Sequence, residues 1–174
     1  AAYLVEGQGS RSFSNLKRML HREPETLAAL LRHLTDLTVD YLNAQIEAGA
    51  QVVQLFDTWA GLLSPAEYRQ WVLPGHQEIA SRVRRDQAPL ILYVNDGAHV
   101  VDAMVEAGSD VVSLDWRVDL ARVAREFGDR VSVQGNLDPC ALAAPADEIR
   151  AAVRSLARDG GAARGHILNL GHGC

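Results

Sequence analysis

The residues of this chain best suited to chemistry stand at the ends of short apolar runs. Five such runs end in carboxylate, hydroxyl, amide or imidazole groups: Asp57 and Thr58, Asn95 and Asp96, Asp115, Gln134 with Asn136 and Asp138, and Asn169 with His172. Groups of these kinds bind polar ligands and transfer protons. A buried strand that ends in polar residues is typical of β/α barrels and open α/β sheets, where the site lies at the carboxyl ends of the strands. The sequence therefore predicts that these residues form the floor of one site.

Five predicted strands position these groups. They cover residues 51–57, 90–96, 111–116, 131–136 and 167–170. Helices are predicted over residues 11–20, 24–48, 65–85, 99–106, 119–127 and 145–158, after a short helix or strand exit at residues 1–6. Strands that alternate with helices in this way favour a parallel sheet with crossover helices.

Local signals predict where several helices begin. Ser10 is a predicted N-cap for the helix over residues 11–20, and Pro24 suits the first turn of the long helix that follows. Apolar residues at helical spacing predict one buried face of that long helix: Leu27, Leu30, Leu31, Leu34, Leu37, Tyr41, Leu42 and Ile46. Ser64 and Glu67 form a capping box around Pro65 and are predicted to begin a single helix that runs to about residue 85.

An internal repeat supports this arrangement. Residues 47–57, EAGAQVVQLFD, match residues 106–116, EAGSDVVSLDW. In both segments a helix is predicted to end at Ala-Gly shortly before a strand, which predicts parallel strands with right-handed crossovers. The units average about 29 residues, close to the roughly 31 per unit of an eight-unit barrel. The predicted fold class is therefore α/β, a (β/α)8 TIM-type barrel of which this chain holds about five consecutive units.

Five units cannot close such a barrel. We therefore expect residues 1–174 to form a single, partial barrel domain. About three strands are expected upstream of Ala1, and a last helix is expected after Cys174.

Composition excludes several classes of function. The chain has 174 residues, of which 17 are basic and 22 acidic, giving a formal net charge of −5. This balance offers no electrostatic surface for nucleic acid, and no apolar run approaches the roughly 18–20 residues of a membrane span. Cys140 and Cys174 form neither a disulfide framework nor a metal-binding spacing, and no signal pattern stands at the N-terminus. We expect a cytoplasmic protein that binds neither nucleic acid nor membranes.

Six stretches, in the same order along the chain, resemble the uroporphyrinogen decarboxylase family of haem-pathway enzymes, which have a β/α barrel fold. They are YLVEG at 3–7 with GSR at 9–11, NAQIEAG at 43–49, LFDTWAGLLS at 55–64, LDW at 114–116, QGNLDP at 134–139 and NLGHG at 169–173. The last two stretches together are the most specific.

The resemblance implies a carboxy-lyase. It would remove CO2 from the four acetate side chains of uroporphyrinogen III and form coproporphyrinogen III, as a homodimer without cofactor or metal. A protonated pyrrole can accept the electrons that CO2 leaves behind, and a carboxylate near the pyrrole NH groups would stabilise the developing cation. The family's catalytic aspartate and its arginine-rich segment are expected upstream of Ala1, so no catalytic aspartate is assigned in this chain.

Three substrate-binding positions of the family fall on residues of this chain. The resemblance implies that Tyr3 helps to place the substrate near the catalytic aspartate. It implies that Thr58 contacts a substrate carboxylate and that His172 faces the substrate in the cleft. Without the resemblance, Tyr3 would be interpreted as a core aromatic residue and Thr58 as a cap, and His172, between two glycines, would have a site role at even odds.

Other polar groups have structural interpretations. Asp57 and Asp115 are expected to cap the following helices or to bind loop amides. Asn136 and Asp138 suit a turn, although their position leaves a site role open. His76 is expected to be solvated on a helix surface.

Two other functions stay open. The first is a zinc-dependent corrinoid or thiol methyltransferase of the same superfamily, which commonly holds zinc with an H-x-C pair. His99 is followed by two valines, and His172 with Cys174 alone would make a poor zinc site. The second is an inactive, truncated chain that only binds porphyrin or a partner. An intact arginine-rich segment and aspartate upstream would favour the enzyme.

Overall fold

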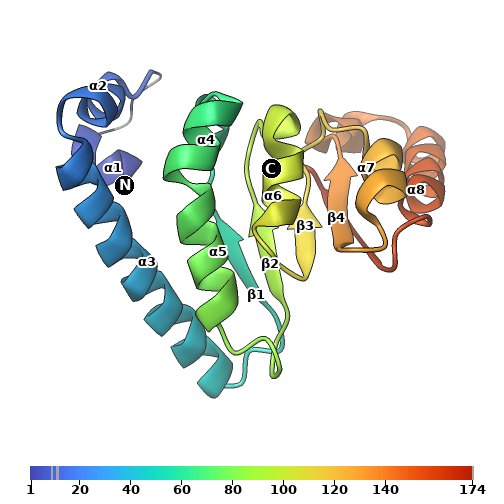
Figure 1. The fold of residues 1–174 in the computed structure, drawn as a ribbon. Helices are drawn as coiled ribbons and strands as arrows, with labels where there is room; N and C mark the ends of the chain where they lie inside the picture. The colour runs from blue at the N-terminus through green and yellow to red at the C-terminus, as the bar shows by residue number, and fades with distance from the viewer. Residues whose placement is uncertain (9, 11, 174) are drawn as a thin grey trace.

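Five parallel strands form a single sheet whose spatial order follows the chain. The computed structural model describes residues 1–8, 10 and 12–173. The strands are β1 (Val53–Phe56), β2 (Leu90–Tyr93), β3 (Val111–Ser113), β4 (Ser132–Leu137) and β5 (His166–Leu170). Each pairs in parallel with the next along the chain (Figure 1). The predicted α/β class with five consecutive parallel strands is confirmed.

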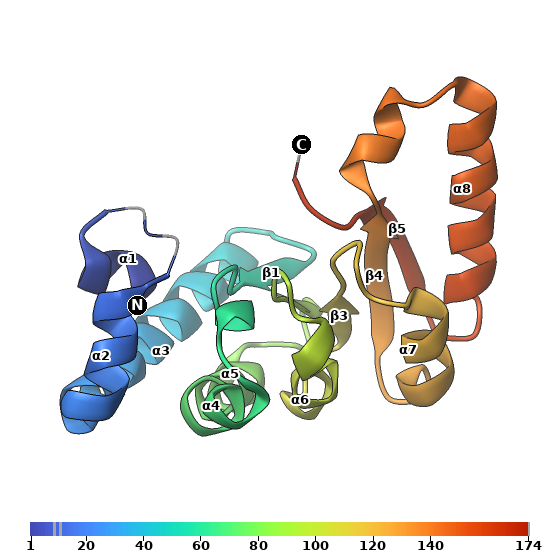
Figure 2. The ribbon, with the colours of Figure 1, turned by 90° about the horizontal axis from the view of Figure 1, so that it is seen from above.

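The described residues also form eight α-helices, of which the first three precede β1, and three short 3-10 helices. The α-helices are α1 (Ala2–Glu6), α2 (Ser14–Arg22), α3 (Pro24–Glu47), α4 (Pro65–Trp71), α5 (Leu73–Arg82), α6 (Val101–Glu106), α7 (Leu120–Phe127) and α8 (Ala146–Gly160). The 3-10 helices are η1 (Ala60–Leu62), η2 (Ala98–Val100) and η3 (Pro139–Ala143). Seen along the strands, the helices form an arc outside the sheet, and none of the α-helices of the described residues covers its inner face (Figure 2). None of the helices in the described part of the chain is long and apolar enough to cross a membrane.

Both copies of the internal repeat end a helix in the same way. Gly49 follows α3 with a φ of 104°, and Gly108 follows α6 with a φ of 83°. A side chain at either position would meet no atom within 4 Å, so the left-handed backbone, not lack of space, favours glycine there. Each glycine turns the chain from the helical layer back into the sheet, at β1 and at β3.

The core lies between the sheet and the helical arc. Its main cluster joins residues of β2, β3 and β4 and of the segments that follow them to α4, α6 and α7, with Tyr68, Met104 and Val123 almost fully buried. A second cluster joins α3, β1 and α5 through residues such as Leu42, Val53 and Ile79. Full burial of one such aliphatic side chain contributes about 1.5–3 kcal/mol. This packing fixes the strand ends at which the polar groups stand.

Two helix boundaries differ from the sequence prediction. Helix α2 begins at Ser14, not at residue 11, and the Ser10 hydroxyl accepts a hydrogen bond from the Phe13 N–H at 3.0 Å instead of capping the helix. Gly9 and Arg11, which belong to the predicted N-terminal motif, lie outside the described residues. The prediction of a single helix over residues 65–85 is wrong: two helices meet at Val72. Pro74 has no N–H to donate to the preceding helical turn, and its ring would clash with a carbonyl oxygen of that turn in a continuous helix. The predicted capping box at Ser64 is confirmed.

The buried face of α3 differs in part from the predicted one. Leu27, Leu42 and Ile46 are buried as predicted, but Leu37 and Tyr41 are 51% and 66% exposed. The helix carries two adjacent apolar stripes, and only the one that includes Thr35 and Val39 faces the core. Periodicity alone does not distinguish two such stripes.

Candidate active site

The segment after β5 crosses the carboxyl edge of the sheet. The N–H of Gly171 donates to the carbonyl of Leu137 at 2.7 Å, and its own carbonyl lies 3.1 Å from the Tyr93 hydroxyl. A Cβ on Gly171 would lie 2.2 Å from the backbone nitrogen of Trp116. Residue 171 therefore touches the ends of β4, β3 and β2 in turn, and only glycine fits this approach. The crossing carries His172 from the outermost strand toward the middle of the edge.

A second glycine brings the β1 and β2 ends together. A Cβ on Gly61, in η1, would lie 2.1 Å from the carbonyl oxygen of Asn95. The side-chain oxygen of Asn95 lies 3.2 Å from the hydroxyl of Tyr93. The close backbone contact at Gly61 thus joins the two strand ends, and the Asn95–Tyr93 contact fixes the β2 end itself.

Tyr93 links these segments through a neutral hydroxyl. Its ring is 6% exposed, and its single proton is shared between the Asn95 and Gly171 acceptors. Burial, with a smaller contribution from the Asp115 charge, raises the pKa of Tyr93 to about 12, although Arg117 opposes the shift. The hydroxyl therefore stays protonated and serves as a donor.

Asp115 is a fully buried carboxylate at the end of β3. Its Oδ1 accepts a hydrogen bond from the Arg117 backbone N–H at 2.8 Å, which confirms the predicted loop-amide role. Its Oδ2 has no hydrogen-bond partner among the described residues, and the Arg117 guanidinium lies 3.6 Å away. The Asn136 amide donates to the carbonyls of Asp115 and Val118 at 2.8 and 2.7 Å. This turn is therefore held rigidly, with one unsatisfied carboxylate oxygen inside it.

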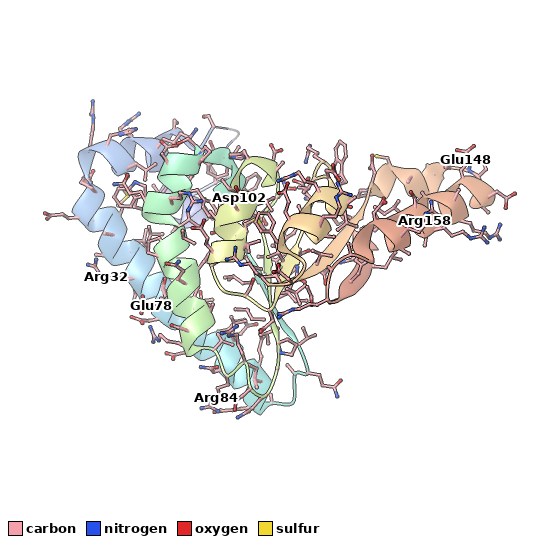
Figure 3. All side chains as sticks on the ribbon, turned by 45° about the vertical axis from the view of Figure 1, so that its right-hand side comes forward. Arg32, Glu78, Arg84, Asp102, Glu148 and Arg158 are labelled. Carbon is pink, nitrogen blue, oxygen red and sulfur yellow. The ribbon has the colours of Figure 1, made fainter. Side chains whose placement is uncertain are left out.

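Arg117 is a functional candidate that the sequence prediction missed. It is the only lysine or arginine in the five segments that follow the strands, at residues 57–64, 94–97, 114–119, 138–145 and 171–173. Its guanidinium lies over the Trp116 ring, 4.4 Å from the centroid, and 3.9 Å from the Asp96 carboxylate. Arg158 lies instead on the outer helix α8 (Figure 3), and Arg32 of α3 lines the cavity that also holds Tyr3 and Thr58. A count of the basic residues in each segment that follows a predicted strand could have found Arg117.

Three hydrogen-bonded polar groups, of which Tyr68 and His76 are buried, support the β1 end. His76 Nδ1 lies 3.0 Å from the Tyr68 hydroxyl, and His76 Nε2 lies 3.1 Å from Asp57 Oδ2. His76 is 5% exposed, so the prediction that it is solvated is wrong. His76 lies on the buried face of α5 with Leu73, Ile79 and Ala80. The prediction that Asp57 caps the following helix is wrong, because η1 has Trp59 at its N-cap and no side-chain cap hydrogen bond.

The structure brings two of the three predicted substrate-binding residues together. Tyr3 and Thr58 both line a cavity of about 710 Å³ between α1, α3, α5 and the end of β1. Tyr3 is 60% exposed and meets the Trp59 ring edge-on at 6.1 Å. It is therefore not the core aromatic residue that its sequence context alone favoured.

His172 is not part of that cavity lining. It is exposed on the segment that crosses the other strand ends, with Nδ1 2.9 Å from the Gly173 carbonyl. Within the described residues no group of three His, Cys, Asp or Glu side chains could hold a metal ion. Cys174, which the zinc alternative would pair with His172, lies outside those residues.

Comparison with known proteins identifies the family. The profile of the family described as Uroporphyrinogen decarboxylase (URO-D) matches residues 1–174. Curated proteins named uroporphyrinogen decarboxylase from Geobacter sulfurreducens and Geotalea daltonii are 43% and 44% identical over 173 residues, which is 99% of this chain and 51% of each relative. One from Coxiella burnetii is 44% identical over 177 residues, 99% of this chain and 49% of the relative. The chain thus spans about half the length of the curated relatives it matches.

Proposed function

Because the chain belongs to the uroporphyrinogen decarboxylase family, we propose that its complete gene product removes CO2 from the four acetate side chains of uroporphyrinogen III. The product is coproporphyrinogen III. The observation that carries this proposal is the 43–44% identity to relatives of that name, which extends over 99% of the chain.

The described residues supply one part of the proposed site. The Thr58 hydroxyl and the His172 imidazole orient carboxylates of the substrate by hydrogen bonds. Tyr3 orients either the substrate or the catalytic aspartate that is expected upstream of Ala1. Support comes from the position of all three residues at or above the carboxyl edge of a parallel sheet, where sites of this fold class lie.

The chemistry divides into binding and charge stabilisation. Breaking the bond to CO2 leaves an electron pair, which a pyrrole protonated at a ring carbon accepts. A second proton then completes the methyl group, and loss of the ring-carbon proton restores the pyrrole. A preorganised carboxylate beside the pyrrole NH groups stabilises the cation. The substrate itself accepts the electrons, so we propose that the reaction needs neither cofactor nor metal. We also propose a cytoplasmic homodimer, on the family resemblance.

The test is anaerobic turnover of uroporphyrinogen III by the complete gene product after treatment with a chelator. We expect full activity without added metal, and a dimer by light scattering after size exclusion. Activity that returns only with zinc and a methyl donor would overturn the proposal in favour of a methyltransferase. A folded protein that binds porphyrin without turnover would favour the non-enzymatic alternative.

A further inference from the structure

We propose that Arg117 binds a carboxylate of the substrate at the centre of the carboxyl edge. This inference rests on the proposed function, because its ligand is a tetrapyrrole that carries eight carboxylates. The proposed function assigns carboxylate contacts in this chain only to Thr58 and His172, which are not permanent cations. Arg117 would add a permanent positive charge to these carboxylate contacts.

Charge distribution points to this residue first. The five segments that follow the strands contain several aspartates, among them Asp57, Asp96 and Asp115, but Arg117 is their only lysine or arginine. At these five segments a polyanionic ligand therefore meets one fixed cation, whereas Lys17 and Arg32 line the separate cavity that holds Tyr3 and Thr58.

The donors of Arg117 are free to bind a ligand. A guanidinium has five N–H donors in a planar fork that matches a carboxylate. Its nearest carboxylate oxygens belong to Asp115 at 3.6 Å and Asp96 at 3.9 Å, and both distances exceed those of a hydrogen bond. No side-chain hydrogen bond joins Arg117 to any of the described residues. A ligand carboxylate could therefore form a bidentate pair without breaking an existing hydrogen bond.

The guanidinium is nevertheless held in position. Its plane is supported by the Trp116 ring, and the unpaired Oδ2 of Asp115 lies behind it. A nearby cation stabilises a buried carboxylate oxygen that lacks a hydrogen bond, so Asp115 keeps Arg117 at the edge before the substrate arrives. Lysine could supply the charge but neither the planar fork nor the same stacking.

Asp96 is the group that competes with the ligand. Its side chain is 58% exposed beside the guanidinium, and its charge would repel an incoming carboxylate. Its backbone has a φ of 55°, a conformation that asparagine adopts readily. Asp96→Asn therefore removes the competing charge without straining the turn.

The experiment compares Arg117→Gln, Arg117→Lys, Asp96→Asn and the double variant Arg117→Gln/Asp96→Asn in the complete gene product. Arg154→Gln, on the exposed face of α8, is the matched control. The KM and kcat for uroporphyrinogen III are measured, and so is the Kd for uroporphyrin III, the oxidised form with all eight carboxylates, by fluorescence.

We expect Arg117→Gln to raise KM and Kd about tenfold or more while kcat changes little, since a charged hydrogen-bonding partner is lost. The KM and Kd of Arg117→Lys should lie between those of the wild type and those of Arg117→Gln. Asp96→Asn should lower Kd about two- to threefold, and this gain should vanish in the double variant if it acts through Arg117.

Unchanged KM and Kd in a folded Arg117→Gln protein would overturn the inference while leaving the proposed function intact. If that variant does not fold, a Kd that Asp96→Asn leaves unchanged or raises would overturn it instead. If the wild-type protein shows no turnover, the proposed function fails, and the Kd series still decides whether Arg117 binds the polycarboxylate.

Discussion

The His76 imidazole lies between a phenol and a carboxylate, 3.0 Å from the Tyr68 hydroxyl and 3.1 Å from Asp57 Oδ2. In the neutral tautomer that satisfies both contacts, Nε2–H donates to Asp57 and Nδ1 accepts from Tyr68. Burial also raises the pKa of Tyr68 above its ordinary value, so the phenol remains a donor. Asp57 directly precedes Thr58. The hydrogen bonds from Tyr68 through His76 to Asp57 therefore help to fix the position of Thr58, a proposed substrate contact.

Tyr68→Phe should show how much the Tyr68–His76 hydrogen bond contributes to the stability of the fold. It leaves His76 Nδ1 buried without a donor, and the free energy of unfolding should fall by about 1–3 kcal/mol. Urea unfolding of the complete gene product measures this, with Tyr41→Phe as an exposed control expected to change stability by less than about 0.5 kcal/mol. Equal stabilities of the two variants would mean that the hydrogen bond contributes nothing.

The raised pKa of Tyr93 predicts a pH dependence of stability. An unfolded tyrosine ionises near pH 10, whereas Tyr93 in the fold ionises near pH 12. Below about pH 10 neither state is ionised, and above it the unfolded state loses its proton first. Stability should therefore fall between about pH 10 and pH 12, and Tyr93→Phe should show less of this fall. A difference between wild type and variant that stays constant with pH would contradict the assignment.

The proposed substrate contacts can be tested with matched controls. Tyr3→Phe and His172→Asn should each reduce turnover of uroporphyrinogen by about tenfold or more, because each removes a polar contact made at the site. Tyr41→Phe and His33→Asn, both on the exposed surface of α3, should leave turnover unchanged. If both site variants keep wild-type kinetics, the placement of these residues in the site is wrong.

Single residues were only partly predictable. The sequence predicts that polar groups follow the strands, because apolar runs with polar ends are visible along one segment. It does not reveal that Asp57 meets His76, since that contact depends on how α5 turns against β1. Arg117 was missed for a different reason: its significance depends on the absence of basic residues in the other four strand exits.

At the scale of elements, two close approaches hold the carboxyl edge together. Gly61 brings η1 against the end of β2, and Gly171 brings the exit of β5 against the end of β3. The close approach at Gly171 positions His172. It also provides a physical reason for the first glycine of the NLGHG motif, which the sequence alone did not supply.

Gly171→Ala should therefore be disruptive. The added methyl would lie 2.2 Å from the Trp116 nitrogen, and relief of this clash should cost about 1–3 kcal/mol and displace His172. Gly173→Ala is the matched control, because an added Cβ there meets no atom within 4 Å. Thermal unfolding and turnover should both separate the two variants, and identical behaviour would mean that the crossing is not tight.

Element ends show where sequence reasoning succeeds and fails. The capping box at Ser64 and the start of α3 at Pro24 were predicted because their chemistry is local. The break at Val72 had a local signal too, Pro74 followed by Gly75, but continuous periodicity concealed it. The orientation of α3 had no local signal, because both of its apolar stripes fit a buried face.

At the scale of the whole molecule, the described sheet has two edge strands with exposed apolar residues. Phe56 of β1 is 65% exposed, and Ile167 and Leu168 of β5 are 42% and 48% exposed. Each of these strands is paired on one side only within the described residues. Unpaired strand edges with apolar side chains promote association.

A polypeptide of residues 1–174 alone should therefore self-associate at micromolar concentration, whereas the complete gene product should give a single defined species. Light scattering after size exclusion compares the two. A monodisperse monomer of residues 1–174 that unfolds cooperatively would contradict this expectation.

The parallel direction of β1 and β3 was predictable from the repeat, and the alternation of strands and helices along the chain extended this prediction to all five strands. The path after β5 was not, since nothing in NLGHG indicates which strand ends it will touch. That path joins β5 to β2 and β3 and makes the strand exits one surface.

The most direct test of decarboxylation at this edge is the time course of anaerobic uroporphyrinogen III conversion by the complete gene product, with products separated by carboxylate number. We expect species with seven, six and five carboxylates to rise and fall before coproporphyrinogen III accumulates, without added metal. If the eight-carboxylate substrate persists unchanged in the presence of folded protein, the assigned reaction is wrong.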